Sequence, residues 1–222
     1  MSDPAQPSQP ARPSVNLRTV RMEAFSDGVF AIAITLLVLE IAVPHVTEEH
    51  IGRELLHQWP VYTAYVVSFA VIGGAWLAHS IITDYLERAD AILLRLNLLF
   101  LFFVSLLPFP TSMLSAYLRH ADAERIATVT YGLNLLAISG LLSIMWHYSV
   151  SEGLLRPVED QDELRELTIR LDPSLALYGI AIATGVLFPR VAFFLYLTIA
   201  LMGFIPFVAI ARWMRHRRLH GR

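Results

Sequence analysis

Charged side chains stand inside an otherwise apolar segment near the start of the chain. Arg21 and Asp27 belong to the sequence RMEAFSDG, which runs without a break into VFAIAITLLVLEI. Residues 21–41 would form about 30 Å of α-helix, which matches the hydrocarbon thickness of a bilayer. An ionised carboxylate inside such a helix costs about 2.5–3.5 kcal/mol on insertion scales unless it finds partners. We therefore expect Asp27 either to act in function or to anchor an assembly.

Two further apolar segments carry polar residues at the same expected depth. Asp27 lies roughly 9 Å inside its helix, and His79 and Asn97 lie roughly 7.5 and 10 Å inside the same end of the next two helices. Trp76 precedes His79 by three residues and shares its helix face. Because polar groups in hydrocarbon must satisfy one another, we expect a hydrogen-bonded network across three helices. Such a network has two readings: a structural anchor, or a proton relay through Asp27 and His79.

The composition is that of a polytopic membrane protein, because 55% of the 222 residues are hydrophobic, 16% are charged, and the mean hydropathy is +0.54. The absence of cysteine excludes disulfides, thiolate metal sites and cysteine catalysis. No HExxH, GxSxG or phosphate-binding loop occurs, and His45, His50 and His57 lack metal-ligand spacing. We therefore expect no enzyme, no cofactor and no nucleic-acid partner, with the arginine-rich C-terminal end acting as a cytoplasmic flank.

Six apolar stretches predict an all-α protein with six transmembrane helices. Their expected bounds are 21–43, 58–83, 91–117, 125–149, 173–188 and 191–211. The predicted organisation is a disordered cytoplasmic tail over residues 1–17, a transmembrane domain over 18–213 and a basic cytoplasmic tail over 214–222. The tail assignment of residues 1–17 follows from their Pro, Ser and Gln content.

The distribution of arginine predicts the orientation. All 17 basic residues are Arg. With the N-terminus inside, only four of them fall on the outer side, and the other thirteen fall on the cytoplasmic side; the four are Arg53, Arg119, Arg125 and Arg190. The positive-inside rule therefore places both termini in the cytoplasm.

A helical wheel separates two faces of the first helix. Ile32, Leu36 and Leu39 fall within about 60° of one another, with Thr35 beside them. Asp27 lies about 140° from Ile32 on the same wheel. If one face lines a pathway, the other holds Asp27 against neighbouring helices. By composition alone, an Ile/Leu/Leu stripe is more often core or lipid contact than pore.

The pattern Arg21-x-x-x-Phe25-Ser26-Asp27 resembles the RxxxFSD signature of the transmembrane protein 175 family. These are potassium-permeable channels of endosomes and lysosomes, with single-repeat prokaryotic relatives. The pair Trp76-x-x-His79 is similar to the partner pair on the family's second helix. The chain carries one signature, so the resemblance implies the prokaryotic form: a homotetramer in the plasma membrane, with four first helices around a central pore.

The resemblance also implies roles for individual residues. Ile32, Leu36 and Leu39 match the apolar constriction of the first helix, and Thr35 matches a polar position nearby. The signature residues would form a polar network that holds the pore helix, together with Trp76, His79 and Asn97. The implied function is passive potassium permeation, with selectivity and gating at apolar rings. The alternative is a proton pathway or proton-coupled transporter.

The segment Thr128-Val129-Thr130-Tyr131-Gly132 is similar to the TVGYG filter of ordinary potassium channels. That filter requires non-helical backbone that presents rings of carbonyl groups. Here the segment opens a continuous apolar stretch, and Thr130 replaces the central glycine. We therefore expect an ordinary helix at this position and no selectivity filter.

Overall fold

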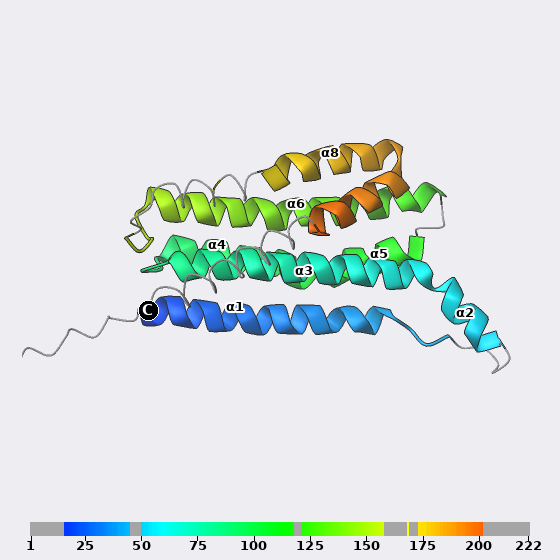
Figure 1. Ribbon diagram of the computed structural model, residues 1–222, viewed down its shortest axis with the longest axis horizontal. Coiled ribbons are helices and arrows are strands. Elements are labelled where there is room, and N and C mark those ends of the chain that lie inside the picture. Colours follow the sequence, from blue (N-terminus) through cyan, green and yellow to red (C-terminus); the bar gives the residue numbers. More distant parts are fainter. Residues whose placement is uncertain (1–15, 45–49, 118–120, 158–167, 169–172, 202–222) are drawn as a thin grey trace, which may run out of the picture.

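The computed structural model describes residues 16–44, 50–117, 121–157, 168 and 173–201. Its long helices run side by side along one axis, with α1 on one side, α8 on the opposite side and the short α2 inclined to the rest (Figure 1). The helices in chain order are α1 (Leu17–Leu36), the 3-10 helix η1 (Leu37–Glu40), α2 (Ile51–His57), α3 (Trp59–Tyr85), α4 (Ala91–Leu106), α5 (Pro108–Tyr117), α6 (Ala121–Ser151), α8 (Pro173–Leu187) and the apolar helix Pro189–Leu201. The described part of the chain is all-α, as predicted.

Four helical segments of the described chain are long and apolar enough to cross a membrane. They are Leu17–Glu40, Trp59–Tyr85, Ala91–Tyr117 and Ala123–Ser151. Two shorter apolar helices follow, Leu175–Leu187 and Pro189–Leu201. The predicted end of the sixth span at residue 211 and most of both predicted tails lie outside the described residues.

The first span begins four residues earlier than predicted, because Asn16 caps it. The Asn16 side chain accepts a hydrogen bond from the backbone N–H of Arg18 at 3.0 Å, which satisfies a donor that the helix itself leaves unpaired. The α-helix then ends at Leu36, and residues 37–40 continue it as a 3-10 turn. The predicted direction of Leu39 assumed 100° per residue along an uninterrupted α-helix. Because residues 37–40 are wound as a 3-10 helix, that angle is not accurate for Leu39.

The third span is divided at Leu107, which separates α4 from α5. Pro108 has no N–H to donate, so the carbonyl of Val104 accepts from Leu107 instead, at 3.3 Å. This leaves the carbonyl of Phe103 without its usual helical donor. The side-chain amide of Asn134, on α6, donates to that carbonyl at 3.2 Å. The neighbouring helix thus supplies the hydrogen bond that the proline removes.

The core runs through the whole bundle, from α1 to α8 and the helix Pro189–Leu201, and α1 closes one side of it by packing on α3 and α4. One face of α1 and η1 is buried at helical spacing: Thr19, Met22, Ser26, Phe30, Ala33 and Leu37. The remaining circumference of α1 is largely exposed in this single chain. The fold therefore presents a long apolar surface of the first helix to the outside.

Candidate functional site

The exposed face of α1 carries the residues that were predicted to form the apolar constriction of a pore. Ile32 is 62% exposed, Leu36 42% and Leu39 73%. Thr35 is exposed on the same face, where its hydroxyl donates to the carbonyls of Ala31 and Ile32 at 2.9 Å. The buried face points about 115° away from this face round the helix. These apolar side chains are therefore free to meet another surface, and their own chain does not use them as core.

A buried polar network joins α1, α3 and α4. Ser26, His79 and Asn97 are 0%, 1% and 2% exposed. The Asn97 amide donates to the Ser26 hydroxyl at 3.0 Å, and Ser26 donates to the carbonyl of Met22 at 2.8 Å. His79 Nε2 lies 2.8 Å from Asn97 Oδ1. Because an amide oxygen only accepts hydrogen bonds, His79 Nε2 carries the proton and donates this hydrogen bond to Asn97. Asn97 in turn donates to Ser26, and Ser26 donates to the carbonyl of Met22.

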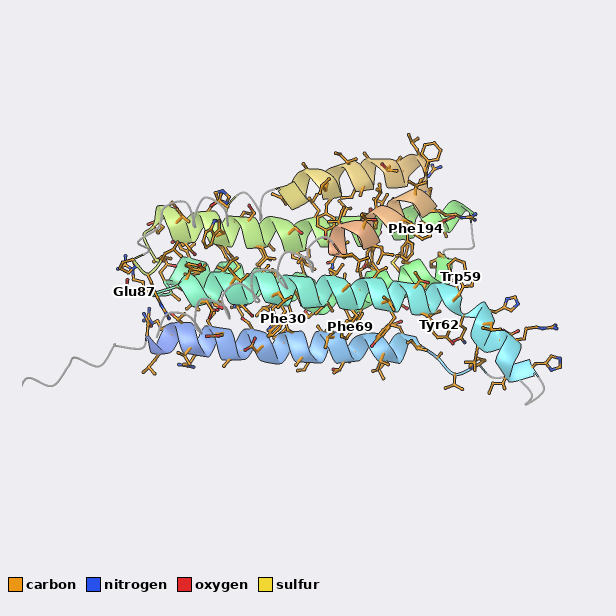
Figure 2. The ribbon with its side chains drawn as sticks, viewed as in Figure 1. Phe30, Trp59, Tyr62, Phe69, Glu87 and Phe194 are labelled. Atoms are coloured by element: carbon orange, nitrogen blue, oxygen red, sulfur yellow. The ribbon has the colours of Figure 1, made fainter. Side chains whose placement is uncertain are left out.

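Aromatic rings enclose His79. Its imidazole stacks on Phe100 with ring centroids 5.5 Å apart and planes 3° from parallel. Phe30 covers it from α1 at 5.8 Å, and Figure 2 shows Phe30 between α1 and the α3–α4 layer. The other ring nitrogen, Nδ1, is buried and has no hydrogen-bond partner among the described residues. The sequence alone does not single out Phe30 or Phe100, because buried aromatic residues are common in any apolar helix.

Asp27 and Trp76 form a second, separate polar pair. The indole N–H of Trp76 donates to Asp27 Oδ1 at 2.8 Å. Unlike the buried network, this pair lies at the surface of the chain, where Asp27 is exposed and Trp76 is 41% exposed. Phe25 is also exposed, at 56%. Arg21 is exposed and forms no ion pair with Asp27 within the described chain. The residues predicted as one network thus divide into a buried group and a surface group.

A second buried polar cluster, which the sequence did not predict, joins α3, α5 and α6. The hydroxyl of Ser68, on α3, lies 2.8 Å from Thr111 on α5 and 3.0 Å from Tyr131 on α6. Tyr131 and Thr128 belong to the segment similar to a potassium filter, and this segment lies inside the continuous helix α6. The expectation of an ordinary helix there is therefore confirmed. Single hydroxyl groups in apolar helices give no sequence signal for such a cluster, because they can also bond within their own helix.

The N-terminal ends of α1 and α4 meet the C-terminal end of α6. A cavity of about 610 Å³ there is lined by Asn16, Leu17, Arg18, Arg88, Ala89, Asp90, Glu152 and Leu154. Asp90 caps α4 through the backbone N–H of Leu93 at 2.8 Å and accepts a hydrogen bond from Tyr148. These two hydrogen bonds, chiefly the one from Tyr148, hold the pKa of the Asp90 carboxyl below its usual value. The three helix ends thus share one end of the bundle.

Of the histidines without metal-ligand spacing, His50 and His57 lie at the two ends of α2, and His45 lies outside the described residues. Among the described residues, no group of three or more His, Asp or Glu side chains is placed to hold a metal ion.

Comparison with known proteins gives a consistent result. The pattern of the family described as endosomal/lysosomal potassium channel TMEM175 matches residues 21–108. A potassium channel of Streptomyces collinus is 42% identical over 170 residues, which cover 76% of this chain and 82% of that protein. The mouse endosomal/lysosomal proton channel TMEM175 is 37% identical over 117 residues, which cover 48% of this chain and 23% of that protein.

The fold also matches a solved structure of a channel described as a TMEM175 homolog. The crystal structure of a lysosomal potassium-selective channel TMEM175 homolog from Chamaesiphon minutus superposes with a TM-score of 0.76 at 33% sequence identity. The match covers 86% of this chain and 98% of that one. The signature, the sequence identity over most of the chain and the common fold lead to one conclusion: the chain belongs to the family of the endosomal/lysosomal potassium channel TMEM175.

Proposed function

We propose that the protein is a potassium-permeable cation channel of a prokaryotic plasma membrane. In this proposal six helices of each copy span the bilayer, both termini are cytoplasmic, and four copies place their first helices around a central pathway. No enzymatic step is involved. The family and the similarity to the potassium channel of Streptomyces collinus support potassium as the permeant ion. The long apolar helices support a location in the membrane.

The observation that carries this proposal is the exposed apolar face of α1. A single copy leaves Ile32, Leu36 and Leu39 outside its core. Four such faces around an axis would form apolar rings, with the Thr35 hydroxyl as a polar position between them. Ile32 lies about 16 Å along the helix from Arg21, near the middle of the membrane. A dry ring at this depth is an effective barrier, because an ion must shed water to pass.

Selectivity in this arrangement arises from the cost of dehydration. Potassium sheds its hydration water at a lower free-energy cost than sodium, so a narrow apolar ring favours potassium without any specific ligand. The same ring can also close to ions by dewetting. The signature residues and their partners hold the pore helix in this proposal: Arg21, Phe25, Ser26, Asp27, Trp76, His79 and Asn97.

Potassium flux from liposomes that contain the purified protein tests the function. We expect efflux down a potassium gradient at equal internal and external pH, with slower flux of sodium under a matched gradient. Protein-free liposomes are the control for leak. The absence of flux for both cations, from protein that elutes as a folded oligomer, would contradict a channel.

A proton pathway is the second candidate function. The buried imidazole of His79, whose Nδ1 has no hydrogen-bond partner among the described residues, favours it, as does the description of the mouse relative as a proton channel. Proton entry into potassium-free liposomes measures this activity. A relay requires His79→Leu to abolish proton flux and leave potassium flux, whereas a structural network predicts that both fluxes fall together with the amount of folded protein.

A further inference from the structure

We propose that the cavity at the shared end of α1, α4 and α6 binds a phospholipid headgroup that carries both a phosphate and a primary amine, as phosphatidylethanolamine does. This inference goes beyond ion conduction, because it assigns a lipid partner to the end of the bundle that the predicted orientation places at the cytoplasmic leaflet. It depends on a location in the membrane and not on the identity of the permeant ion.

The cavity lies at the level where the membrane-spanning segments end. The spans Leu17–Glu40 and Ala91–Tyr117 begin beside it, and the span Ala123–Ser151 ends beside it. The ends of a span lie in the polar headgroup layer of a bilayer. The volume of about 610 Å³ is that of a site for a small ligand, for which roughly 300–1,000 Å³ is usual. The headgroup of a neighbouring lipid is therefore of suitable size and at the right depth.

Two arginines supply the phosphate-binding part of the cavity. Arg18 and Arg88 both line it, both are exposed, and neither forms an ion pair within the described part of the chain. The planar guanidinium group binds phosphate oxygens through paired hydrogen bonds. The positive end of α1 adds to this attraction, because the first turn of that helix carries no acidic side chain. Basic pockets between membrane helices bind lipid headgroups in this way.

Two carboxylates make the lining of the cavity zwitterionic. Asp90 and Glu152 line it together with the two arginines, so the formal charges balance. The hydrogen bond from Tyr148 holds the pKa of the Asp90 carboxyl below its usual value, so Asp90 is ionised at neutral pH. Glu152 is exposed and forms no ion pair among the described residues. These carboxylates repel a purely anionic headgroup and attract an ammonium group, which favours phosphoethanolamine over phosphoglycerol.

Backbone hydrogen bonds fix one wall of the cavity. The carbonyl of Leu154 accepts from the N–H groups of Glu87 and Arg88 at 2.9 and 3.3 Å. The N–H of Arg156 donates to the carbonyl of Tyr85 at 2.8 Å. The segment after α3 is thus tied to the segment after α6. The position of Arg88 is therefore set by the fold and does not depend on the ligand.

The apolar part of the lining indicates a lipid and not a soluble phosphate ester. Leu17 lines the cavity beside Arg18 and is 74% exposed. A lipid covers such a side chain with its glycerol backbone and acyl chains, whereas a soluble ester leaves it in water.

Native mass spectrometry of the full-length protein tests the site. The protein in detergent is given equal amounts of phosphatidylethanolamine and phosphatidylcholine with the same acyl chains, which differ only in methylation of the amine. We expect phosphatidylethanolamine to be retained in preference. Arg18→Gln and Arg88→Gln should each weaken retention of both lipids roughly tenfold, because both lipids carry the phosphate. Glu152→Gln should remove the preference and leave retention of phosphatidylcholine unchanged.

Matched controls come from neighbouring residues that do not line the cavity. Arg95 is exposed on α4, and Glu87 is exposed at the same end of the bundle (Figure 2). Arg95→Gln and Glu87→Gln should retain both lipids as the parent does. Equal retention of the two lipids by the parent would overturn the inference, and so would unchanged retention by the Arg18→Gln and Arg88→Gln variants.

A soluble competitor distinguishes the lipid from its headgroup. Glycerophosphoethanolamine has the same phosphate and amine but no acyl chains. We expect it to displace the bound lipid only at a much higher concentration than phosphatidylethanolamine itself requires. Displacement at an equal concentration would show that the ligand is a soluble phosphate ester, which would overturn the assignment to a lipid.

Discussion

At the scale of single residues, the two faces of α1 assign different roles to side chains of the same type. Ile32 is 62% exposed, whereas Ile34, two positions later, is partly buried against the core. The two isoleucines therefore form a matched pair, one for the proposed pathway and one for packing within the chain.

If Ile32 forms the narrowest of the proposed apolar rings, its replacement by Asn should admit water there. We expect higher conductance and a weaker preference for potassium over sodium, with the fold intact, because the side chain contributes little to its own core. Ile34→Asn should instead lower the thermal stability, because it buries an amide among apolar groups. Reversal potentials in mixed potassium and sodium solutions measure the preference. A shift for Ile34→Asn with none for Ile32→Asn would show that the pore face is wrongly assigned.

Asn97 is the residue on which the buried network depends. Asn97→Leu keeps a similar volume but leaves His79 Nε2 without its acceptor and removes the amide that donates to Ser26, whose hydroxyl still donates to Met22. Each unsatisfied buried group costs about 1–3 kcal/mol, so we expect a clear fall in the melting temperature in detergent. Ser105→Ala is the control, because that exposed hydroxyl, also on α4, bonds only to the carbonyl of Phe102 in its own helix. Equal melting temperatures for the two variants would contradict a structural role for the network.

At the scale of helices, close packing depends on a few backbone positions. Gly132 on α6 lies against the helix Pro189–Leu201, where the buried hydroxyl of Tyr196 donates to the carbonyl of Thr128 at 3.3 Å. A Cβ at residue 132 would collide with that hydroxyl and would lie 2.7 Å from Ile182 Cγ1. The glycine therefore permits the contact between α6 and the last described helix.

Gly132→Ala should separate these helices and lower the stability by roughly 1–3 kcal/mol, the usual cost of overpacking. Tyr196→Phe in the same chain removes the nearest colliding atom and should restore part of the loss. Gly179→Ala is the control, because a Cβ at that position meets nothing within 4 Å. Thermal unfolding in detergent measures all three variants. If Gly132→Ala were as stable as Gly179→Ala, the proposed close contact would be wrong.

At the scale of the whole molecule, one chain would supply only one wall of the proposed pathway. The helices also alternate in direction. The N-terminal ends of α1 and α4 and the C-terminal end of α6 line one cavity, so these three ends lie on one side of the bundle. This arrangement agrees with consecutive helices that cross the membrane in opposite directions. The arginine bias then predicts that this shared side is cytoplasmic.

Cysteine introduced at Ser8 or His220 tests this topology, since the parent chain has no thiol. We expect a membrane-impermeant maleimide to label both positions only after the cells are permeabilised. Gln58→Cys, near the opposite end of the bundle, should be labelled in intact cells. Labelling of Ser8→Cys or His220→Cys from outside would reverse the orientation. In native mass spectra the same protein should appear as a tetramer, and a stable monomer in mild detergent would contradict the pore.

The sequence by itself determined the class of protein, the long apolar helices and the family, because these depend on composition, periodicity and a local signature. It also placed Asp27, His79 and Asn97 near one depth, since helix rise is constant. Only the tertiary structure decided which groups bond. Asp27 pairs with Trp76 at the surface while Ser26 joins Asn97 and His79 inside, because adjacent residues on a helix point about 100° apart and packing selects the face that is buried. The 3-10 end of the first span and the Gly132–Tyr196 contact likewise depend on neighbouring helices, which a local pattern does not encode.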